Sequence, residues 1–542
     1  MKIKYLNFLC ILLIIFPFNI FANTGKELKR ATYRQKFKKT VSSAGVSLTS
    51  VDNPNGNVTV RGVKEGDIEI RAVKKVTARS LRLAKDITEE IEIEVEKRGS
   101  IVYIRTIFPE IDYTEFFRVF KRRIGMSVDY DITLPSRLNI DVRNKYGDVS
   151  VDNINELDVD NVSGNLFIKL IGGRANLKNS YGSVIVSDVS GDLTSENKSG
   201  KTKVYRVKGS VRIENSYDKV ILSDIDGTVD VVNKSGSVEV SNAGSNVDLE
   251  TSYDNVDVNN VKGGLTVINK SGKVRAEYID GFTSISTTYA NVTLKEVKNG
   301  ARIMDKSGSV IVSNIDGNLT VETSYDRVEI EDVTGSVKVY NKSGGVSLLN
   351  IGGDAEVSTS YNPVNISRVK GKVTVDSKSG KVSIKKAGRS VNIKTSYNPV
   401  ILNDIGGSVE VINKSGSVYA DSVAGSVDIV TTYSSIELYR IGGSVTASTS
   451  SGNIEADLHF QPDCTYRMET SYGNILLNIS GEINAYFTAI VPKYEEIELL
   501  GGLQITTNKL SREKITGVIG DGSGEIYLEV RKSGHIRVRK VR

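Results

Sequence analysis

Two short phrases, one with a tyrosine and one with Lys-Ser-Gly, alternate along most of this 542-residue chain. Tyr217 and Tyr253 are 36 residues apart, as are Gly236 and Gly272, and Ser235 of one phrase follows Tyr217 of the other at half that spacing. An internal repeat of fixed length indicates one repetitive architecture rather than several unrelated domains. The chain is therefore a 36-residue double repeat, made of an 18-residue unit in two alternating versions.

Apolar and polar residues alternate within each unit. Val238 and Val240 open one half of a unit, and Val247 and Leu249 open the other half nine residues later. Alternation with a period of two is typical of β-strands that bury one face. Each unit is therefore predicted to hold two short strands and two turns.

The two turns of the unit carry different markers. One turn carries Gly, Asp or Asn, which tolerate a left-handed backbone, so we expect a tight left-handed corner there. The other turn has an apolar residue in every unit from Val189 to Ile441, which predicts a buried column and units stacked in register. The expected left-handed corner residues are Gly236, Gly272, Gly308, Asp218, Asp254, Asp326, Asn362 and Asn398.

These patterns predict an all-β fold, a parallel β-solenoid in which each 18-residue unit forms one coil. We expect a right-handed coil, because parallel crossover connections are right-handed in most proteins. The repeats are assigned to residues 146–478, an N-terminal β cap to 23–145, and closing coils with a C-terminal cap to 479–542. Caps are expected because an open first or last coil would present unpaired strand edges.

Residues 1–22 predict export of the chain. Lysines at the start, an apolar run and the small residue Ala22 form the pattern of a cleaved signal peptide. The run is too short to span a bilayer, so we expect no transmembrane segment in the mature chain and a periplasmic, cell-surface or secreted location. Cys464 would be the only cysteine left, which excludes an internal disulfide.

Charge and composition argue against several classes of function. The 71 basic and 65 acidic residues are interspersed and leave a net charge of +6, which does not favour nucleic-acid binding. Histidine occurs only at His459 and His535, so a histidine metal site is not expected. A calcium-binding roll of nonapeptides would need an aspartate in every half-coil, whereas equivalent corners here hold Asn362, Ala290 or Ser434. We expect no metal and no cofactor.

Three further segments carry a resemblance to a known family. They are NPNGNVTVRG at 53–62, ITLPSRLNIDVRNKYGDVSV at 132–151 and IGDGSGEIYLEV at 519–530, with the recurrent SGSVEV and GSVDIV phrases between them. With them the chain resembles the bacterial putative-adhesin family of β-strand repeat proteins. The resemblance implies an exported β-helical protein and an adhesive or scaffolding role, and it supplies no catalytic residues.

The candidate site is the edge where the tyrosine and Lys-Ser-Gly turns alternate. One interpretation is structural, with each ring covering the small Ser-Gly corner of the neighbouring coil. The other is functional, with exposed rings and lysines binding an anionic or sugar polymer or a protein partner. The residues are Tyr217, Tyr253, Tyr289, Tyr325, Tyr361 and Tyr397, with Lys234, Lys270, Lys306, Lys342, Lys378 and Lys414.

We expect a non-enzymatic adhesin or envelope scaffold. The alternative is a carbohydrate-active β-helix enzyme, a polysaccharide lyase or hydrolase, which would need two acids and a base on one exposed face. The insertion at 459–470 is the irregularity within the repeats that could serve such a site. Residues 112–126, DYTEFFRVFKRRIGM, place phenylalanines beside basic residues and are expected to pack on the cap, or to dock on an anionic membrane or partner.

Overall fold

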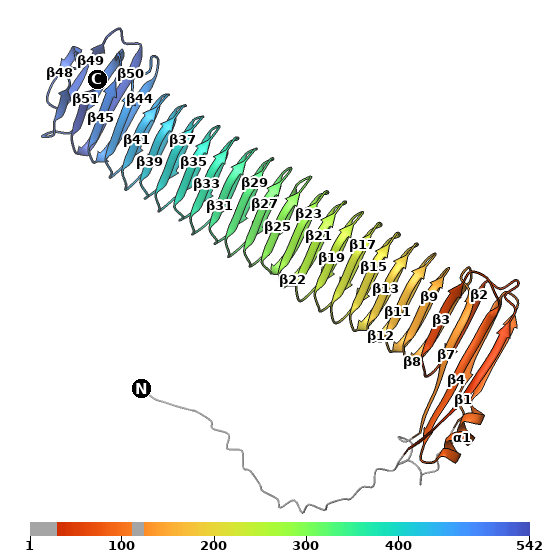
Figure 1. Cartoon of the computed structure of the whole chain (residues 1–542). Coiled ribbons are helices and arrows are strands. Elements are labelled where there is room, and N and C mark those ends of the chain that lie inside the picture. The colour runs from red at the N-terminus through yellow and green to blue at the C-terminus, as the bar shows by residue number, and fades with distance from the viewer. Residues whose placement is uncertain (1–29, 111–123, 542) are drawn as a thin grey trace, which may run out of the picture.

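The structure, a computed structural model, describes residues 30–110 and 124–541. It is a long rod of stacked strands with a separate assembly at each end and one helix, α1 (Leu81–Glu90), beside the N-terminal assembly (Figure 1). The predicted signal peptide and most of the segment 112–126 lie outside the described residues. The fold confirms the prediction of an all-β parallel solenoid.

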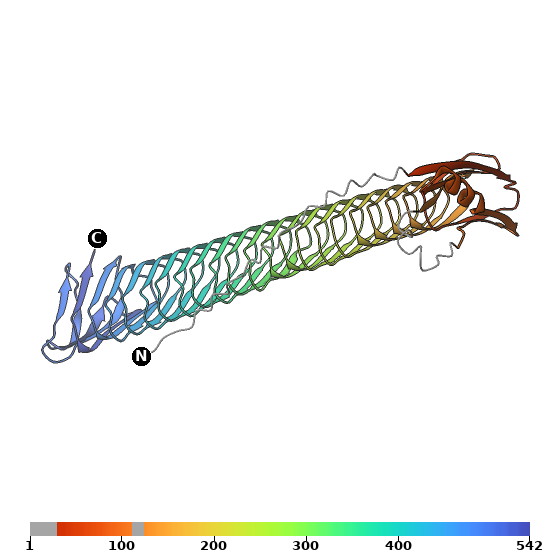
Figure 2. The ribbon, with the colours of Figure 1, turned by 90° about the horizontal axis from the view of Figure 1, so that it is seen from below.

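The rod is built from two facing sheets. Strands β8 to β45 form nineteen coils, and each coil gives one even-numbered strand to one sheet and one odd-numbered strand to the other. Figure 2 shows the two sheets as opposite walls of a narrow rod. Side chains that alternate inward from both sheets form one continuous apolar core along the rod.

The odd sheet of the rod contains β9 (Val149–Ile154), β11 (Leu166–Ile171), β13 (Val184–Val189), β15 (Thr202–Val207), β17 (Val220–Ile225), β19 (Val238–Ala243), β21 (Val256–Val261), β23 (Val274–Ile279), β25 (Val292–Val297), β27 (Val310–Ile315), β29 (Val328–Val333), β31 (Val346–Ile351), β33 (Val364–Val369), β35 (Val382–Ala387), β37 (Val400–Ile405), β39 (Val418–Val423), β41 (Ile436–Ile441), β43 (Ile454–His459) and β45 (Ile475–Ser480).

The even sheet contains β8 (Asn139–Tyr146), β10 (Leu157–Ser163), β12 (Ala175–Tyr181), β14 (Leu193–Ser199), β16 (Val211–Asn215), β18 (Val229–Asn233), β20 (Val247–Thr251), β22 (Leu265–Ser271), β24 (Thr283–Tyr289), β26 (Ala301–Met304), β28 (Leu319–Thr323), β30 (Val337–Asn341), β32 (Ala355–Thr359), β34 (Val373–Ser377), β36 (Val391–Thr395), β38 (Val409–Asn413), β40 (Val427–Thr431), β42 (Val445–Thr449) and β44 (Thr465–Tyr472).

Successive coils stack in register with an 18-residue step. Val238 pairs with Val256 in parallel strands, and Ala243 pairs with Val261 at the far end of the same strands. The apolar position that was predicted to form a column is buried from Val189 to Ile441. The coil length and the in-register column are therefore confirmed.

The left-handed corner prediction is confirmed in part. Asp218 and Asp254 have φ of 83° and 85°, and Gly236 and Gly272 have φ of 118° and 107°. Gly308 also has a positive φ, whereas Asp326, Asn362 and Asn398 do not, so the prediction is wrong for those three. Asn362 and Asn398 each precede a proline, whose ring restricts the preceding residue to extended conformations.

A second left-handed position was missed from the sequence. The residue just before each apolar column residue has a positive φ, for example 57° at Asn242 and 58° at Arg368. Because of this bulge, two consecutive side chains point outward before the column residue turns back into the core. Residues as different as Tyr278 and Lys386 occupy the position, so no residue type marked it in advance.

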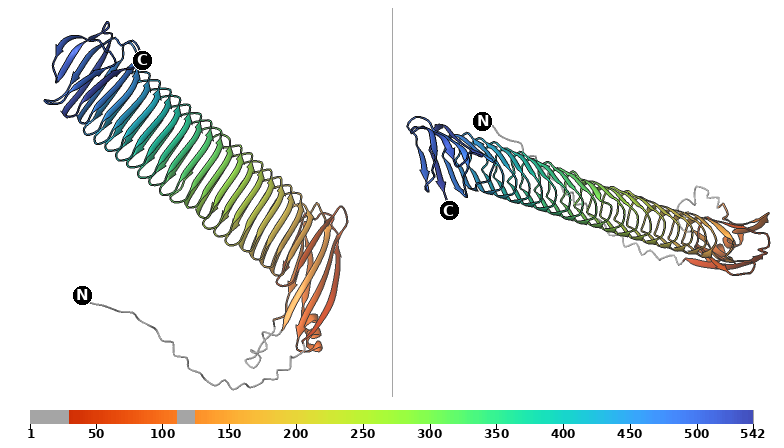
Figure 3. Two further views of the ribbon diagram at one scale, coloured as in Figure 1. Left: turned by 60° about the vertical axis from the view of Figure 1, so that its left-hand side comes forward. Right: turned by 90° about the horizontal axis from the view of Figure 1, so that it is seen from above.

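The N-terminal assembly adds one more coil and then changes direction. The strands β2 (Leu48–Asn53) and β3 (Val58–Val63) stack in parallel on β8 and β9, although they lie about 90 residues earlier in the chain. Outside them, β7 (Gly125–Pro135), β4 (Ile68–Ala78) and β1 (Ala31–Val41) continue the odd sheet, the last two in antiparallel order. These long strands extend past the side of the rod (Figure 3).

On the even sheet of this assembly, β6 (Ile101–Ile107) pairs in parallel with β2, and β5 (Glu92–Arg98) pairs in antiparallel order with β6.

The C-terminal assembly inserts the last strands of the chain into the stack. The strands β50 (Gly524–Ser533) and β51 (Ile536–Lys540) pair in parallel with β44 and β45. The earlier strands β46 (Ala485–Ile490) and β47 (Ile497–Leu500) lie outside them. Antiparallel pairing of β46 with β49 (Lys514–Ile519), and of β49 with β48 (Thr506–Leu510), ends the parallel order.

Candidate functional site

The tyrosines and the Lys-Ser-Gly turns lie on one edge of the rod, where each coil passes from the even to the odd sheet. Tyr181 pairs with Ser199 of the next coil, and Ser271 pairs with Tyr289. Tyrosine and serine therefore alternate along this edge, and tyrosines recur every second strand layer, about 9.6 Å apart. We call this surface the tyrosine–lysine edge.

Most of each tyrosine ring on this edge faces solvent. Exposed fractions run from 60% at Tyr253 to 70% at Tyr289, so packing against the neighbouring corner covers only the smaller part of each side chain. The lysines are also exposed, and none of the six forms an ion pair with another described residue. The edge thus presents the rings and ammonium groups of Tyr217, Tyr253, Tyr289, Tyr325, Tyr361, Tyr397, Lys234, Lys270, Lys306, Lys342, Lys378 and Lys414 together.

The glycines of the edge are required by the close approach of neighbouring coils. A Cβ at Gly236 would lie 2.1 Å from the carbonyl oxygen of Asp218, and one at Gly416 would lie 2.0 Å from that of Asn398. Both distances are far shorter than any van der Waals contact. A small residue here lets the coils stack closely and keeps the tyrosines above and below in one row.

A buried polar ladder fixes the same corners from inside. Asn233 is fully buried, and its side-chain amide donates to the carbonyl oxygens of Asp218 at 3.2 Å and Gly236 at 2.9 Å. Asn413 makes the equivalent bonds to Asn398 and Gly416. Corner carbonyls would otherwise be buried without a partner, which is costly. The Asn of Asn-Lys-Ser-Gly is thus an internal support of the edge.

One member of this ladder is a carboxylic acid. Asp305 takes the place of the asparagine, is 5% exposed, and accepts a hydrogen bond from Thr287 at 2.6 Å. Its second carboxylate oxygen has no protein partner. Burial raises the pKa of Asp305, and the hydrogen bond from Thr287 opposes that shift.

The charge of the edge changes along the rod. Between residues 217 and 326 the lysines alternate with the corner acids Asp218, Asp254 and Asp326. Between residues 342 and 434 the same corners hold Asn362, Asn398 and Ser434, while the lysines continue. The C-terminal half of the edge therefore has no corner acids, whereas the N-terminal half has three.

The edge also extends beyond the residues selected from the sequence. Tyr472 pairs with Ser533, because β50 stacks on β44. Lys532, Ser533 and Gly534 repeat the Lys-Ser-Gly phrase, and a Cβ at Gly534 would lie 2.0 Å from the carbonyl oxygen of Gly473. The phrase was visible in the sequence, but its distance from the regular repeats concealed that it forms a coil.

The opposite edge carries a shallow groove. Its floor is the apolar column, and one bank is formed by the left-handed residues that precede it. These side chains bond to each other between coils, as in Arg206 to Asp188 at 2.6 and 2.9 Å and Asn260 to Asn242 at 2.8 Å. The hydrogen bond from Arg206 lowers the pKa of Asp188. Sequence reasoning did not find this groove because the residue type of its bank varies.

Acidic residues surround a pair of tyrosines on the outer face of the odd sheet near the C-terminal end. The rings of Tyr419 and Tyr439 are 5.5 Å apart, and Tyr439 pairs with Asp457 while Glu437 pairs with Glu455. Partial burial raises the pKa of Tyr439, and the Glu455 and Glu437 carboxylates add to the rise. Over residues 30–110 and 124–541, no three acidic, histidine or cysteine side chains are placed to hold a metal ion.

Among the described residues, α1 is the single helix. In the part that the structure describes, no helix is both long and apolar enough to cross a membrane.

Comparisons with known proteins give little guidance. No protein-family model matches the sequence, and no curated protein is significantly similar to it. A solved structure of a putative cell adhesion protein from Clostridium sporogenes is 10% identical, with a TM-score of 0.20, over 39% of this chain and 99% of that one. A putative adhesin from Parabacteroides distasonis is 13% identical, with a TM-score of 0.14, over 60% of this chain and 97% of that one. Similarities at these scores do not bear on the function.

Proposed function

We propose that this chain is an exported, non-enzymatic adhesin or envelope scaffold whose tyrosine–lysine edge binds a linear anionic polysaccharide. The observation that carries the proposal is the row of exposed tyrosines and unpaired lysines at a constant spacing on a rigid rod. An aromatic face can stack on a sugar ring, and an ammonium group can pair with a carboxylate or sulfate. Each contact is weak, but a polymer that engages many at once is bound strongly.

From the charge distribution we expect the tightest binding in the C-terminal half of the edge. There the lysines are not accompanied by corner acids, so an anionic polymer meets no compensating repulsion. Binding should weaken with added salt, because the lysines are exposed and screened. Export is proposed from the N-terminal sequence and would be tested by determining the N-terminus of the mature protein.

The test compares two triple variants with the same change of charge. Lys342, Lys378 and Lys414 are changed to Gln in one, and Lys198, Lys234 and Lys270 in the other, with long polygalacturonate as probe and neutral dextran as control. We expect the first variant to lose about 10- to 100-fold in affinity at low salt and the second to lose less, with both folded as the parent. Equal binding by the parent and both variants across a salt titration would refute the proposal.

The tyrosines need a separate measurement. Replacing Tyr361 and Tyr397 with Ser removes two exposed rings from the C-terminal half while keeping the small residue that stacks there in alternate coils. If the rings contact the polymer, affinity falls although thermal stability changes little. If stability falls and binding per folded molecule is unchanged, the rings serve packing, and the lysines alone carry the binding.

The enzyme alternative rests on the acids near Tyr439. Glu437 and Glu455 are neighbours on one exposed face, as paired carboxylates of glycosidases are. Under our proposal the protein releases no new sugar ends from polygalacturonate or other acidic polysaccharides. Release of such ends that is lost in Glu455→Gln would replace the adhesin proposal with the enzymatic one.

A further inference from the structure

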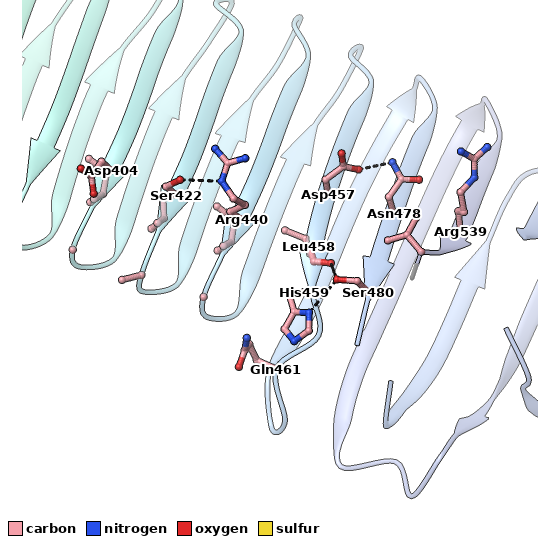
Figure 4. A pocket seen from close by; sticks show the side chains of 17 residues that line it. Asp404, Ser422, Arg440, Asp457, Leu458, His459, Gln461, Asn478, Ser480 and Arg539 are labelled. Atoms are coloured by element: carbon pink, nitrogen blue, oxygen red, sulfur yellow. Dashed lines mark hydrogen bonds between the residues drawn. The ribbon is translucent and has the colours of Figure 1, made fainter. Parts of the chain in front are cut away.

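A distinct cleft lies on the groove edge, where the insertion at 459–470 interrupts the regular coils. Each coil up to β41 bends at its left-handed residue. The strand β43 has no such residue and continues straight. Its last residues, Leu458 and His459, pair with Ile479 and Ser480 of β45. The two extended strands raise a second bank beside the groove. Figure 4 shows Asp404, Ser422, Arg440, Asp457, Asn478 and Arg539 along successive strands, with His459 at the end of β43 and Gln461 just beyond it.

The floor of this cleft is open and apolar. Ile405, Val423 and Ile441 form it, and the adjoining turn residues are Gly406, Ala424 and Gly442. In coils nearer the N-terminus the same turn position often carries a long side chain, such as Lys262 or Lys298. The cleft has a volume of about 710 Å³, within the range of small-ligand pockets, and a space of about 780 Å³ lies farther along the groove beside Lys262 and Lys298.

The polar side chains on the banks are held in place by hydrogen bonds within the protein, although some of their donor or acceptor atoms have no protein partner. Ser480 donates its hydroxyl proton to the carbonyl oxygen of Leu458 at 3.3 Å and is 3.0 Å from Nδ1 of His459. In the tautomer that carries the proton on Nδ1, this nitrogen donates to Ser480 and Nε2 is an acceptor. The ring lies against Gly481, where a Cβ would be 2.8 Å from it. Asn478 donates to Asp457, but its own Oδ1 is buried without a partner.

Arginine supplies the remaining recognition groups. Arg440 is held by Ser422 at 3.1 Å and by Asp421, so its charge is already paired. Arg539 also lines the cleft and makes no ion pair or side-chain hydrogen bond with another described residue. The cleft thus offers the exposed imidazole of His459, the guanidinium of Arg539 and an apolar floor.

We propose that this cleft binds a short acidic oligosaccharide, with a sugar carboxylate on Arg539 and a sugar hydroxyl on His459. The apolar floor suits the C–H face of a sugar ring, whereas a lipid chain would leave the polar banks unsatisfied. The site is separate from the tyrosine–lysine edge, since it lies on the opposite side of each coil, and it does not depend on the function proposed for that edge.

The test uses trigalacturonate as the acidic probe and maltotriose as the neutral one, with binding followed by calorimetry. Arg539→Gln should weaken trigalacturonate binding by about 10- to 100-fold and leave any binding of maltotriose unchanged. The matched control is Arg537→Gln, on the same strand, whose guanidinium pairs with Glu498 at 2.5 Å and does not line the cleft. That variant should bind as the parent does.

Two further outcomes decide the proposal. His459→Ala should weaken binding of trigalacturonate without lowering the melting temperature by more than a few degrees, because the ring is exposed. The triple change of Lys342, Lys378 and Lys414 to Gln should leave trigalacturonate binding intact, which separates this site from the tyrosine–lysine edge. Failure of the parent to bind trigalacturonate, or equal binding by the parent and Arg539→Gln, would overturn the proposal.

Discussion

At several positions of the coil, the residue type is determined by contacts with the neighbouring coil. The buried Asn position repeats because its side-chain amide bonds to carbonyl groups of the edge corners, as at Asn233. The edge glycines repeat because a Cβ would overlap the carbonyl oxygen of the preceding coil. Lysine and tyrosine at the neighbouring positions face solvent and have no such structural requirement. Their regular recurrence is the reason to assign them a binding role.

Asp305 gives a prediction at this scale. Burial raises its pKa, so folding favours its neutral form, and stability should fall as the pH rises through that raised pKa. Asp305→Asn restores the residue found in equivalent coils and supplies an amide donor. We expect it to stabilise the protein by about 1 kcal/mol near neutral pH and by less in acid.

Thermal or urea unfolding at the two pH values measures the effect of Asp305→Asn. Asp376→Asn is the matched control, because Asp376 is exposed and should show neither the gain nor its pH dependence. A gain that does not shrink in acid would show that the carboxylate charge is not its cause.

At the scale of elements, the 18-residue coil is the unit of folding. Its two strands bury their inward side chains only when strands above and below complete the sheet, because a single coil has two open edges on each sheet. The in-register pairing keeps equivalent positions together, from the column residues to the edge tyrosines. Chain length can therefore change in steps of whole coils.

Deleting Tyr253–Thr288 tests this unit. The deletion removes two coils and joins Ser252 to Tyr289, so the edge sequence and the register are kept. We expect a folded, shorter rod with the circular dichroism of the parent. Deleting Tyr253–Ile279 instead joins a tyrosine corner to a column corner and should give an unfolded or aggregated protein. Equal folding of both products would contradict the 18-residue coil.

At the scale of the whole molecule, antiparallel pairing ends both sheets at the N-terminal end and the even sheet at the C-terminal end. Parallel coils could otherwise add further strands without limit, including strands of a second molecule. At the C-terminal end the protection depends on β50 and β51, which are inserted between the last regular coil and the outer strands β46 and β47.

Removing residues 524–542 should therefore convert a dispersed rod into an aggregating one. The truncation leaves β44 and β45 with unpaired edges and removes the parallel partner of β46. Light scattering of the purified protein measures the effect, and a control that lacks only residues 541 and 542 keeps β51 complete. A truncated chain that stays monomeric would show that β46–β49 close the rod by themselves.

The repeat sequence by itself determined the coil length, the strands, their buried faces and the edge that carries the tyrosines and lysines. This was possible because a fixed 18-residue step with parallel, in-register pairing leaves each position above its equivalent, so Tyr181 must lie on Ser199. The conformation of Asn362 and Asn398 departed from the expectation because the following proline restricts the backbone.

Only the tertiary structure decided how the ends are built and where the cleft lies. The pairing of Val58 with Val149, and of Ile475 with Ile536, joins segments outside the regular repeat, and several strand edges compete for such partners. The cleft brings Arg440, His459 and Arg539 together from three segments, because β43 continues straight only where β45 extends beside it and β51 stacks on β45. A local sequence pattern determines which face of a strand is buried. Which strands pair with each other depends on all the strand edges that are available in the folded chain.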